Sequence, residues 1–148
     1  MRGKTSTPQT NRPPTVLVVD DEPDLREVLC DVLNIGGVHI CVAASGREAI
    51  ELARRQPPDL IVTDLGLGDC TGLDVIDDVR RTRRATPALV ITGQRDPAAL
   101  AQASRLRPLE VMTKPLDVPR LQAAVRQELQ RQDLARRGDL RAARLRRL

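Results

Sequence analysis

The 148-residue sequence contains no Phe, Tyr or Trp. Proteins that hold single-stranded nucleic acid commonly stack its bases on aromatic rings, so that kind of binding surface is excluded. The core must be filled by Val, Leu, Ile and Ala instead. Cysteine is scarce as well: Cys30, Cys41 and Cys70 are odd in number and lack CxxC or metal-ligand spacing. We expect them to be reduced thiols of a cytoplasmic protein.

Long apolar segments are also missing. No stretch approaches the roughly 18 consecutive apolar residues that a membrane span requires. The first 14 residues carry charge and proline but no apolar core, which is unlike a signal peptide. The length fits one domain with short tails. The sequence therefore predicts a soluble, cytoplasmic protein with no membrane span.

Charge divides the chain into three parts. Residues 131–148 hold seven Arg against two Asp, whereas residues 15–130 hold 14 basic and 18 acidic residues. We therefore expect a flexible N-terminal tail over 1–14, a domain over 15–130, and a basic C-terminal helical extension or tail over 131–148. The last segment has two interpretations. It is a basic surface for acidic protein, membrane or nucleic acid, or a solvated and partly disordered end, which we favour.

Five short apolar runs recur along the domain, rich in β-branched residues and continuous rather than alternating. They are typical of strands buried on both faces. The runs are 15–19, 38–43, 60–63, 88–92 and 109–112. Strands that alternate with helices form a parallel sheet covered on both sides, which predicts an α/β fold with five strands and five helices.

Helical patterns fill the intervals between these runs. An apolar stripe over 25–33 follows Pro23, and Ser45 with Glu48 forms a capping-box pattern before a helix to about Arg55. Further helices are predicted from Gly72, from Pro97 to Ser104, and around Leu121 to about Arg137. Gly138 fits the end of the last helix, since glycine inside a helix costs about 1 kcal/mol.

Polar residues follow four of the five apolar runs. Asp20 and Asp21 end the first run, Asp64 the third and Thr92 the fourth, and Lys114 follows the fifth. The carboxyl ends of parallel strands meet at one edge, where ligands of such sheets bind. Carboxylates gathered there repel one another unless a cation intervenes, and Mg²⁺ prefers oxygen ligands. Such a site suits phosphoryl transfer, in which a carboxylate can be the nucleophile.

The motifs "VLVVDDEPDLREVL", "PDLIVTDLGLGDCTGLDVI", "PALVITGQ" and "VMTKPLD" resemble the receiver domain of two-component response regulators, over residues 15–130. The resemblance implies a flavodoxin-like, doubly wound parallel sheet with strand order 2-1-3-4-5. Periodicity alone does not give that order. The resemblance also implies that Asp64 is the phosphoacceptor for a histidine kinase or phosphotransfer protein.

The resemblance further assigns the surrounding residues. It makes Asp21, Asp64 and the backbone carbonyl of Gly66 direct Mg²⁺ ligands, with Asp20 acting through water. Thr92 and Lys114 contact the transferred group, and the peptide bond between Lys114 and Pro115 is cis.

Three features depart from the family. The position that usually holds Tyr or Phe is Val111, so the aromatic part of the phosphorylation switch is missing. The usual Met-Pro after the phosphoacceptor is replaced by Leu67-Gly68, which makes the loop more flexible. No output domain is expected after residue 130, because about 18 residues are too few for a helix-turn-helix domain.

The sequence therefore predicts a stand-alone, non-enzymatic signalling switch. The resemblance implies that it contacts a downstream protein through residues 93–130. We expect a monomer or phosphorylation-dependent dimer without sequence-specific DNA binding. The alternatives are a degenerate receiver that keeps the residues without being phosphorylated, and an adaptor whose basic tail binds nucleic acid or membrane. A metal-dependent phosphatase with an aspartate nucleophile is rejected, because haloacid-dehalogenase-like enzymes, which share this chemistry, begin with an Asp-x-Asp motif on the first strand, whereas here the acids are adjacent.

Overall fold

The computed structural model describes residues 12–93 and 97–148. The predicted flexible tail lies almost wholly outside this range. Each predicted strand is present within one residue at either end. The strands are β1 (Thr15–Val19), β2 (His39–Ala43), β3 (Leu60–Asp64), β4 (Ala88–Thr92) and β5 (Glu110–Thr113). The helices are α1 (Pro23–Leu33), α2 (Gly46–Arg55), α3 (Gly72–Thr82), α4 (Pro97–Arg105) and α5 (Val118–Arg146).

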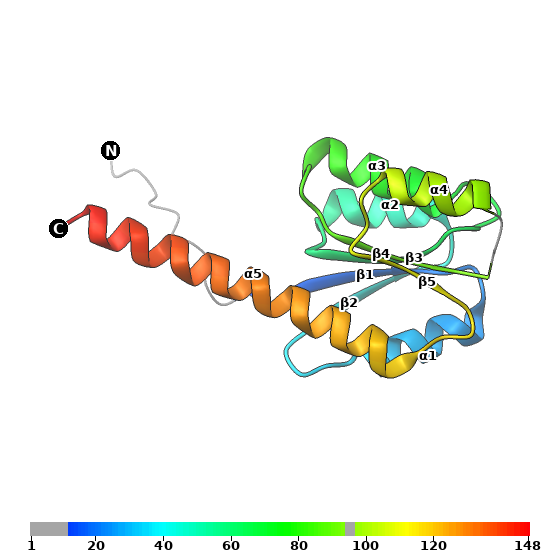
Figure 1. Cartoon of the computed structure of the whole chain (residues 1–148), viewed down its shortest axis with the longest axis horizontal. Coiled ribbons are helices and arrows are strands. Elements are labelled where there is room, and N and C mark those ends of the chain that lie inside the picture. Colours follow the sequence, from blue (N-terminus) through cyan, green and yellow to red (C-terminus); the bar gives the residue numbers. More distant parts are fainter. Residues whose placement is uncertain (1–11, 94–96) are drawn as a thin grey trace.

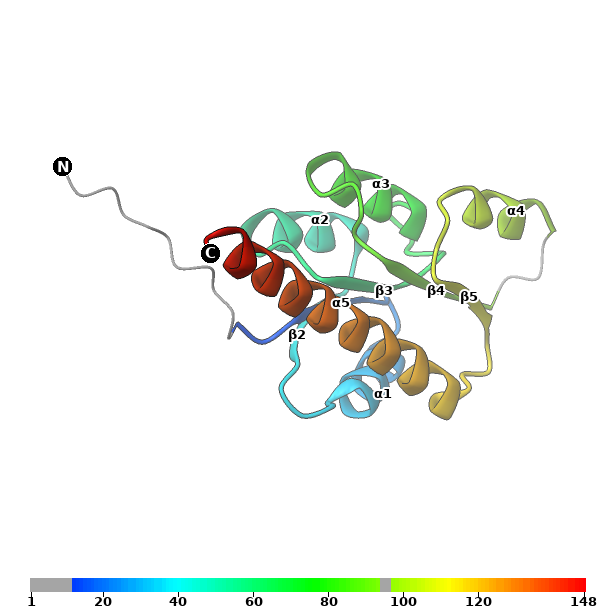
Figure 2. The same ribbon diagram turned by 60° about the vertical axis from the view of Figure 1, so that its left-hand side comes forward.

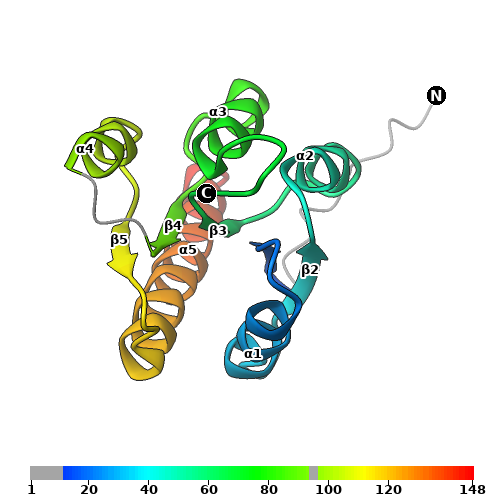
Figure 3. The ribbon, with the colours of Figure 1, turned by 90° about the vertical axis from the view of Figure 1, so that its right-hand side faces the viewer.

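The five strands form one parallel sheet in the order β2-β1-β3-β4-β5. Helices α1 and α5 cover one face, and α2, α3 and α4 cover the other (Figure 3). The predicted doubly wound α/β fold and its strand order are confirmed. All the strands point the same way, so the loops that follow them emerge at one edge, which we call the carboxyl edge.

The core lies on both faces of the sheet and is wholly aliphatic. Successive residues of β1 alternate between the two sides: Leu17 and Val19 pack toward α2 and α3, while Val16 and Val18 pack toward α1 and α5. All four are at most 1% exposed. Burying such side chains contributes roughly 1.5–3 kcal/mol each. Coverage on both faces explains why the strands are continuously apolar in sequence.

The starts of α2 and α3 are fixed by side-chain caps. The Ser45 Oγ accepts a hydrogen bond from the Glu48 N–H at 3.1 Å, as predicted. The Glu48 carboxylate, however, accepts from Ala44 N–H at 2.9 Å, so the capping box closes one residue earlier than the pattern implies. At α3, Thr71 and Asp74 form a complete reciprocal capping box.

The predicted end of the last helix is wrong. Helix α5 runs for 29 residues to Arg146, through Gly138, so the C-terminal segment is the predicted helical extension and not the partly disordered end that we favoured. A single glycine costs about 1 kcal/mol, and the surrounding Ala, Leu and Arg are good helix formers. An ion pair of 3.0 Å between Arg137 and Asp133, four residues apart, supports the same segment. The helix projects past the edge of the sheet where the strands begin (Figures 1 and 2).

None of the helices in the described parts of the chain combines the length and the apolar character needed to cross a membrane. Helix α5 is long enough but is strongly charged throughout its second half.

Candidate functional site

Four carboxylates gather at the carboxyl edge. The residues are Asp20, Asp21, Glu22 and Asp64, and each offers an oxygen within 4.8 Å of the others. The first three follow β1 and the last ends β3, and these two strands are paired neighbours in the sheet. The sheet order therefore brings together acids that are more than 40 positions apart in sequence.

Asp20 is the buried member of the group, with 1% of its surface exposed. One carboxylate oxygen, Oδ1, accepts a hydrogen bond from the Glu22 N–H at 2.8 Å. The other, Oδ2, is buried and has no hydrogen-bond partner. Burial raises the pKa of Asp20 to about 6, and the negative charge of Asp64 adds to this rise. The hydrogen bond from the Glu22 N–H acts in the opposite direction and lowers the pKa. A buried oxygen without a donor is suited to binding a cation.

Lys114 supplies the positive charge of the site. Its ammonium group donates to Asp64 Oδ2 at 2.6 Å and lies 3.6 Å from Glu22 Oε1 and 3.9 Å from Asp20 Oδ2. Burial acts to lower the pKa of Lys114, but the hydrogen bond to Asp64 and the surrounding carboxylates raise it overall. The lysine therefore stays charged and offsets part of the repulsion among the acids.

The backbone holds Lys114 beside the end of β4. The Lys114 N–H donates to the carbonyl of Thr92 at 2.8 Å, and the peptide bond between Lys114 and Pro115 is cis, as predicted. Thr92 is fully buried at the end of β4. Thus the ends of three strands and the segment after β5 place four carboxylates, a hydroxyl and an ammonium group at one edge.

Residues 16–126 match the family model described as the response regulator receiver domain. This chain belongs to the response regulator receiver family. Receiver domains of two-component systems are signalling domains, generally not enzymes, and they interact with histidine kinases or phosphotransfer proteins. They generally bind Mg²⁺ at an acidic pocket, and this chain has an acidic cluster at its carboxyl edge.

Three similar proteins illustrate the relationship. The transcriptional regulatory protein KdpE of Mycobacterium tuberculosis is 36% identical over 115 residues, covering 75% of this chain and 50% of KdpE. The probable transcriptional regulatory protein TcrX of the same species is 45% identical over 83 residues, covering 56% of this chain and 36% of TcrX. This receiver therefore spans half the length or less of these curated relatives.

Among solved structures, the chemotaxis response regulator CheY4 of Vibrio cholerae is 26% identical, with a TM-score of 0.69. The alignment covers 78% of this chain and 98% of CheY4.

The donor set of this receiver fits a magnesium ion. Carboxylate oxygens are the ligands that Mg²⁺ favours, and the group includes the unpartnered buried Oδ2 of Asp20. The Gly66 N–H donates to Asp64 Oδ1 at 3.1 Å, so Gly66 lies beside Asp64 in the loop that follows β3. When bound, the ion would supply positive charge to oxygens of a transferred phosphoryl group.

The loop after Asp64 contains the receiver's Leu67-Gly68 departure. Leu67 is buried, and Gly68 has a φ of +82°, a left-handed conformation that favours glycine. The Asp69 side chain accepts from the N–H groups of Gly46 and Arg47 at 3.0 Å each, tying the loop to the start of α2. These hydrogen bonds hold the pKa of Asp69 below its usual value. The loop that was predicted to be flexible is therefore hydrogen-bonded to the start of α2 through Asp69.

Val111 lies in the middle of β5, opposite Val90 of β4. It is half-buried and packs against the core cluster on the α2–α3 face. A valine at this position has no aromatic ring that could rotate on phosphorylation, as the sequence indicated.

The sequence predicted no role for Glu22 in the site, although its carboxylate forms an ion pair with Lys114. It was visible in sequence as the third acid of the run after β1, but only the fold shows its carboxylate within ion-pair distance of Lys114.

Proposed function

We propose that Asp64 accepts a phosphoryl group from a histidine kinase or phosphotransfer protein, and that the phosphorylated receiver signals through protein contact. The observation that carries this proposal is the difference among the clustered carboxylates. Asp20 is buried, whereas Asp21 is exposed. Glu22, and not Asp21, forms an ion pair with Lys114. Asp64 is mostly buried but keeps 9% of its side chain exposed, and it alone of the four makes a short hydrogen bond to Lys114.

The proposed reaction needs little covalent chemistry from the protein. An Asp64 oxygen bonds to phosphorus while the bond between phosphorus and the donor's imidazole nitrogen breaks, and the imidazole keeps the electron pair. Lys114 neutralises charge on the phosphoryl oxygens, and the Thr92 hydroxyl donates a hydrogen bond to them. In this proposal Asp21, Asp64 and the Gly66 carbonyl hold Mg²⁺, with Asp20 acting through water.

The signal is proposed to leave through residues 93–130. Movement of Thr92 toward the phosphoryl group would displace the segment after β4, because Thr92 ends that strand. Val111 responds only by small changes of rotamer, so the segment after β4 carries most of the change.

The proposal is tested by trapping the acyl phosphate. Purified protein is incubated with Mg²⁺ and acetyl phosphate, reduced with borohydride, and mapped by mass spectrometry. Conversion to homoserine is expected at Asp64 alone and is expected to be lost in Asp64→Asn. The control, Asp24→Asn, removes an exposed carboxylate in the first turn of α1 and should leave labelling unchanged. Labelling at another aspartate, or none in the wild type with phosphorylated kinase as donor, would contradict the proposal and favour a degenerate receiver.

A further inference from the structure

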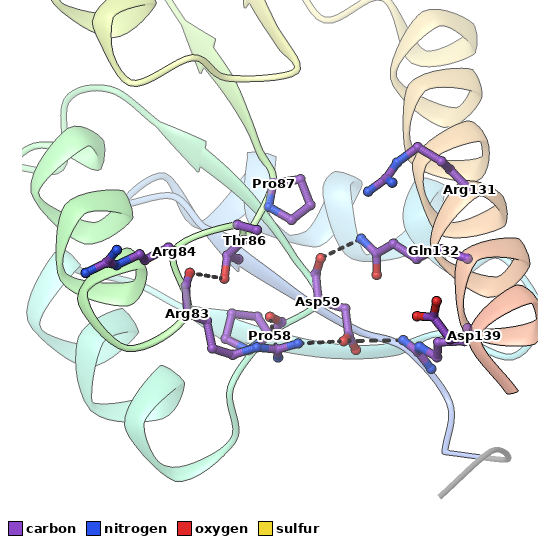
Figure 4. A pocket seen from close by; sticks show the side chains of 12 residues that line it. Pro58, Asp59, Arg83, Arg84, Thr86, Pro87, Arg131, Gln132 and Asp139 are labelled. Carbon is purple, nitrogen blue, oxygen red and sulfur yellow. Dashed lines mark hydrogen bonds and ion pairs between the residues drawn. The ribbon is translucent and has the colours of Figure 1, made fainter. Parts of the chain in front are cut away.

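The edge of the sheet opposite the carboxylates carries a basic groove. One concavity of about 670 Å³ lies between α5 and the loop that joins α3 to β4 (Figure 4). A second, of about 550 Å³, continues from it toward the end of α4. The two share the lining residues Arg84, Ala85, Pro87 and Arg131. We call the two concavities together the basic groove.

Arginines dominate the lining of this groove, and none of its lining residues is a lysine. The arginines are Arg80, Arg83, Arg84, Arg105, Arg107, Arg131 and Arg136; the carboxylates are Asp59, Glu128 and Asp139. Cations therefore outnumber acids by four. Residues 15–130 as a whole carry more acids than bases. The groove thus reflects segregation of charge, with acids at the carboxyl edge and arginines at the other.

A buried carboxylate organises the first half of the groove. Asp59 is 4% exposed and accepts from the Thr15 N–H at 2.7 Å. Its oxygens lie 3.7 Å from the Arg83 guanidinium and 3.6 Å from that of Arg136. Gln132 of α5 also donates to the Asp59 carbonyl at 2.9 Å (Figure 4). Arg12 lies 3.5 Å from Asp59 as well, so one negative charge pairs with three arginines and leaves excess positive charge at the groove.

The second half is organised in the same way by Glu128. This buried carboxylate accepts two hydrogen bonds from Arg131, at 2.8 and 3.0 Å, and they hold its pKa below the usual range. The Arg131 side chain is nevertheless 65% exposed, and that of Arg83 is 46% exposed. The guanidinium groups are therefore positioned in advance while remaining accessible to a ligand, which lowers the ordering cost of binding.

We propose that the basic groove binds the phosphodiester backbone of duplex DNA, independently of sequence. Guanidinium groups recognise phosphate oxygens through paired hydrogen bonds. The groove is open and extended, and the arginines of the C-terminal half of α5 continue its charge beyond the domain. The chain has no aromatic side chain with which to stack an unpaired base, which favours a duplex over a single strand as the ligand. An acidic protein partner is less suited, since Leu106 and Leu109 are the only large apolar side chains in the lining.

The test measures salt-dependent binding of the full chain to a dye-labelled DNA duplex of about 30 base pairs by fluorescence anisotropy. Each neutralised phosphate contributes a slope of about −0.9 to log K against log salt concentration. The double variant Arg84→Gln with Arg105→Gln removes two groove charges outside the Asp59 and Glu128 ion pairs. The slope is expected to become shallower by about 1.8, and a duplex of unrelated sequence should give the same result.

The matched control removes the same charge elsewhere. Arg47→Gln with Arg120→Gln changes residues near the starts of α2 and α5, at the carboxyl edge, and should leave the slope unchanged. An equal loss of slope in this control would overturn the proposal, as would absence of DNA binding at 50 mM salt. Tighter binding to polyglutamate or anionic vesicles at equal salt would also overturn it. Asp64→Asn should bind DNA normally, which keeps this test independent of phosphorylation.

Discussion

Replacing Asp20 by Asn is expected to stabilise the metal-free protein at neutral pH. Substitutions at buried positions usually destabilise, by roughly 0.5–3 kcal/mol. Here the native side chain is itself unfavourable, because one of its oxygens is buried without a hydrogen-bond partner and its neighbours Asp64 and Glu22 are also acidic, which outweighs the Lys114 charge 3.9 Å away. Asparagine removes the charge, keeps an oxygen for the Glu22 N–H, and offers an N–H group to the neighbouring carboxylates.

The size and pH dependence of this effect follow from the pKa of Asp20. Folding raises that pKa from 3.8 to about 6, and each unit corresponds to about 1.4 kcal/mol. The folded state therefore holds its proton more tightly than the unfolded state, and stability falls as the pH rises from about 4 to 6. Above pH 6 the full penalty of at most about 3 kcal/mol applies. Allowing for imperfect pairing of the new amide, we expect a gain of about 1–3 kcal/mol at pH 7.

The assay is thermal unfolding followed by circular dichroism in EDTA, since the chain has no aromatic reporter. A gain of about 2 kcal/mol corresponds to a rise in Tm of about 4–8 °C for a domain of this size. The difference should nearly vanish at pH 4, where Asp20 is protonated in the folded state. Asp24→Asn serves as the control and should change stability by less than about 0.5 kcal/mol. A lower Tm for Asp20→Asn at pH 7, or a gain of equal size at pH 4, would refute the reasoning.

Two further predictions concern glycine and the switch. Gly138→Ala should stabilise the protein by about 0.5–1 kcal/mol in urea unfolding, because a Cβ there meets nothing and alanine favours the helix. Gly72→Ala should instead destabilise it by more than about 1 kcal/mol, because its Cβ would collide with the backbone carbonyl of Asp64; equal effects of the two variants would contradict this account. With beryllofluoride as a phosphate mimic, NMR shifts should concentrate in residues 92–100 and fade by Val111, since exchanging a ring for a valine reduces the burial available to the switch by about 1–2 kcal/mol. Equal shifts in residues 109–116 would mean that another mechanism replaces the aromatic one.

Much of the site could be read from the sequence because the strand ends are marked by composition. A continuous apolar run predicts a strand covered on both faces, and the polar residue that follows it must lie at the edge. Asp20, Asp64, Thr92 and Lys114 were placed together on this basis, and the structure shows them at the same edge. The strand order itself came from the resemblance to receiver domains, since periodicity does not specify which strands are neighbours.

The length of α5 and the role of Glu22 could not be predicted in the same way. A glycine that fits a helix end also fits a helix interior at modest cost, so Gly138 by itself does not decide where the helix stops. Glu22 was one of three consecutive acids, and only the position of the Lys114 ammonium group distinguishes it as an ion-pair partner.

The sequence by itself determined the strands, their burial on both faces and the chemistry of the carboxyl edge, because periodicity and composition are local properties. Only the tertiary structure shows the ion-pair network at the opposite edge of the sheet. Asp59, Arg83 and Arg136 belong to three separate segments that show no common pattern in sequence. They meet because α5 crosses back over the sheet and reaches the loop between α3 and β4. An ion-pair network of this kind depends on distances of a few ångströms between elements, which no local sequence pattern encodes.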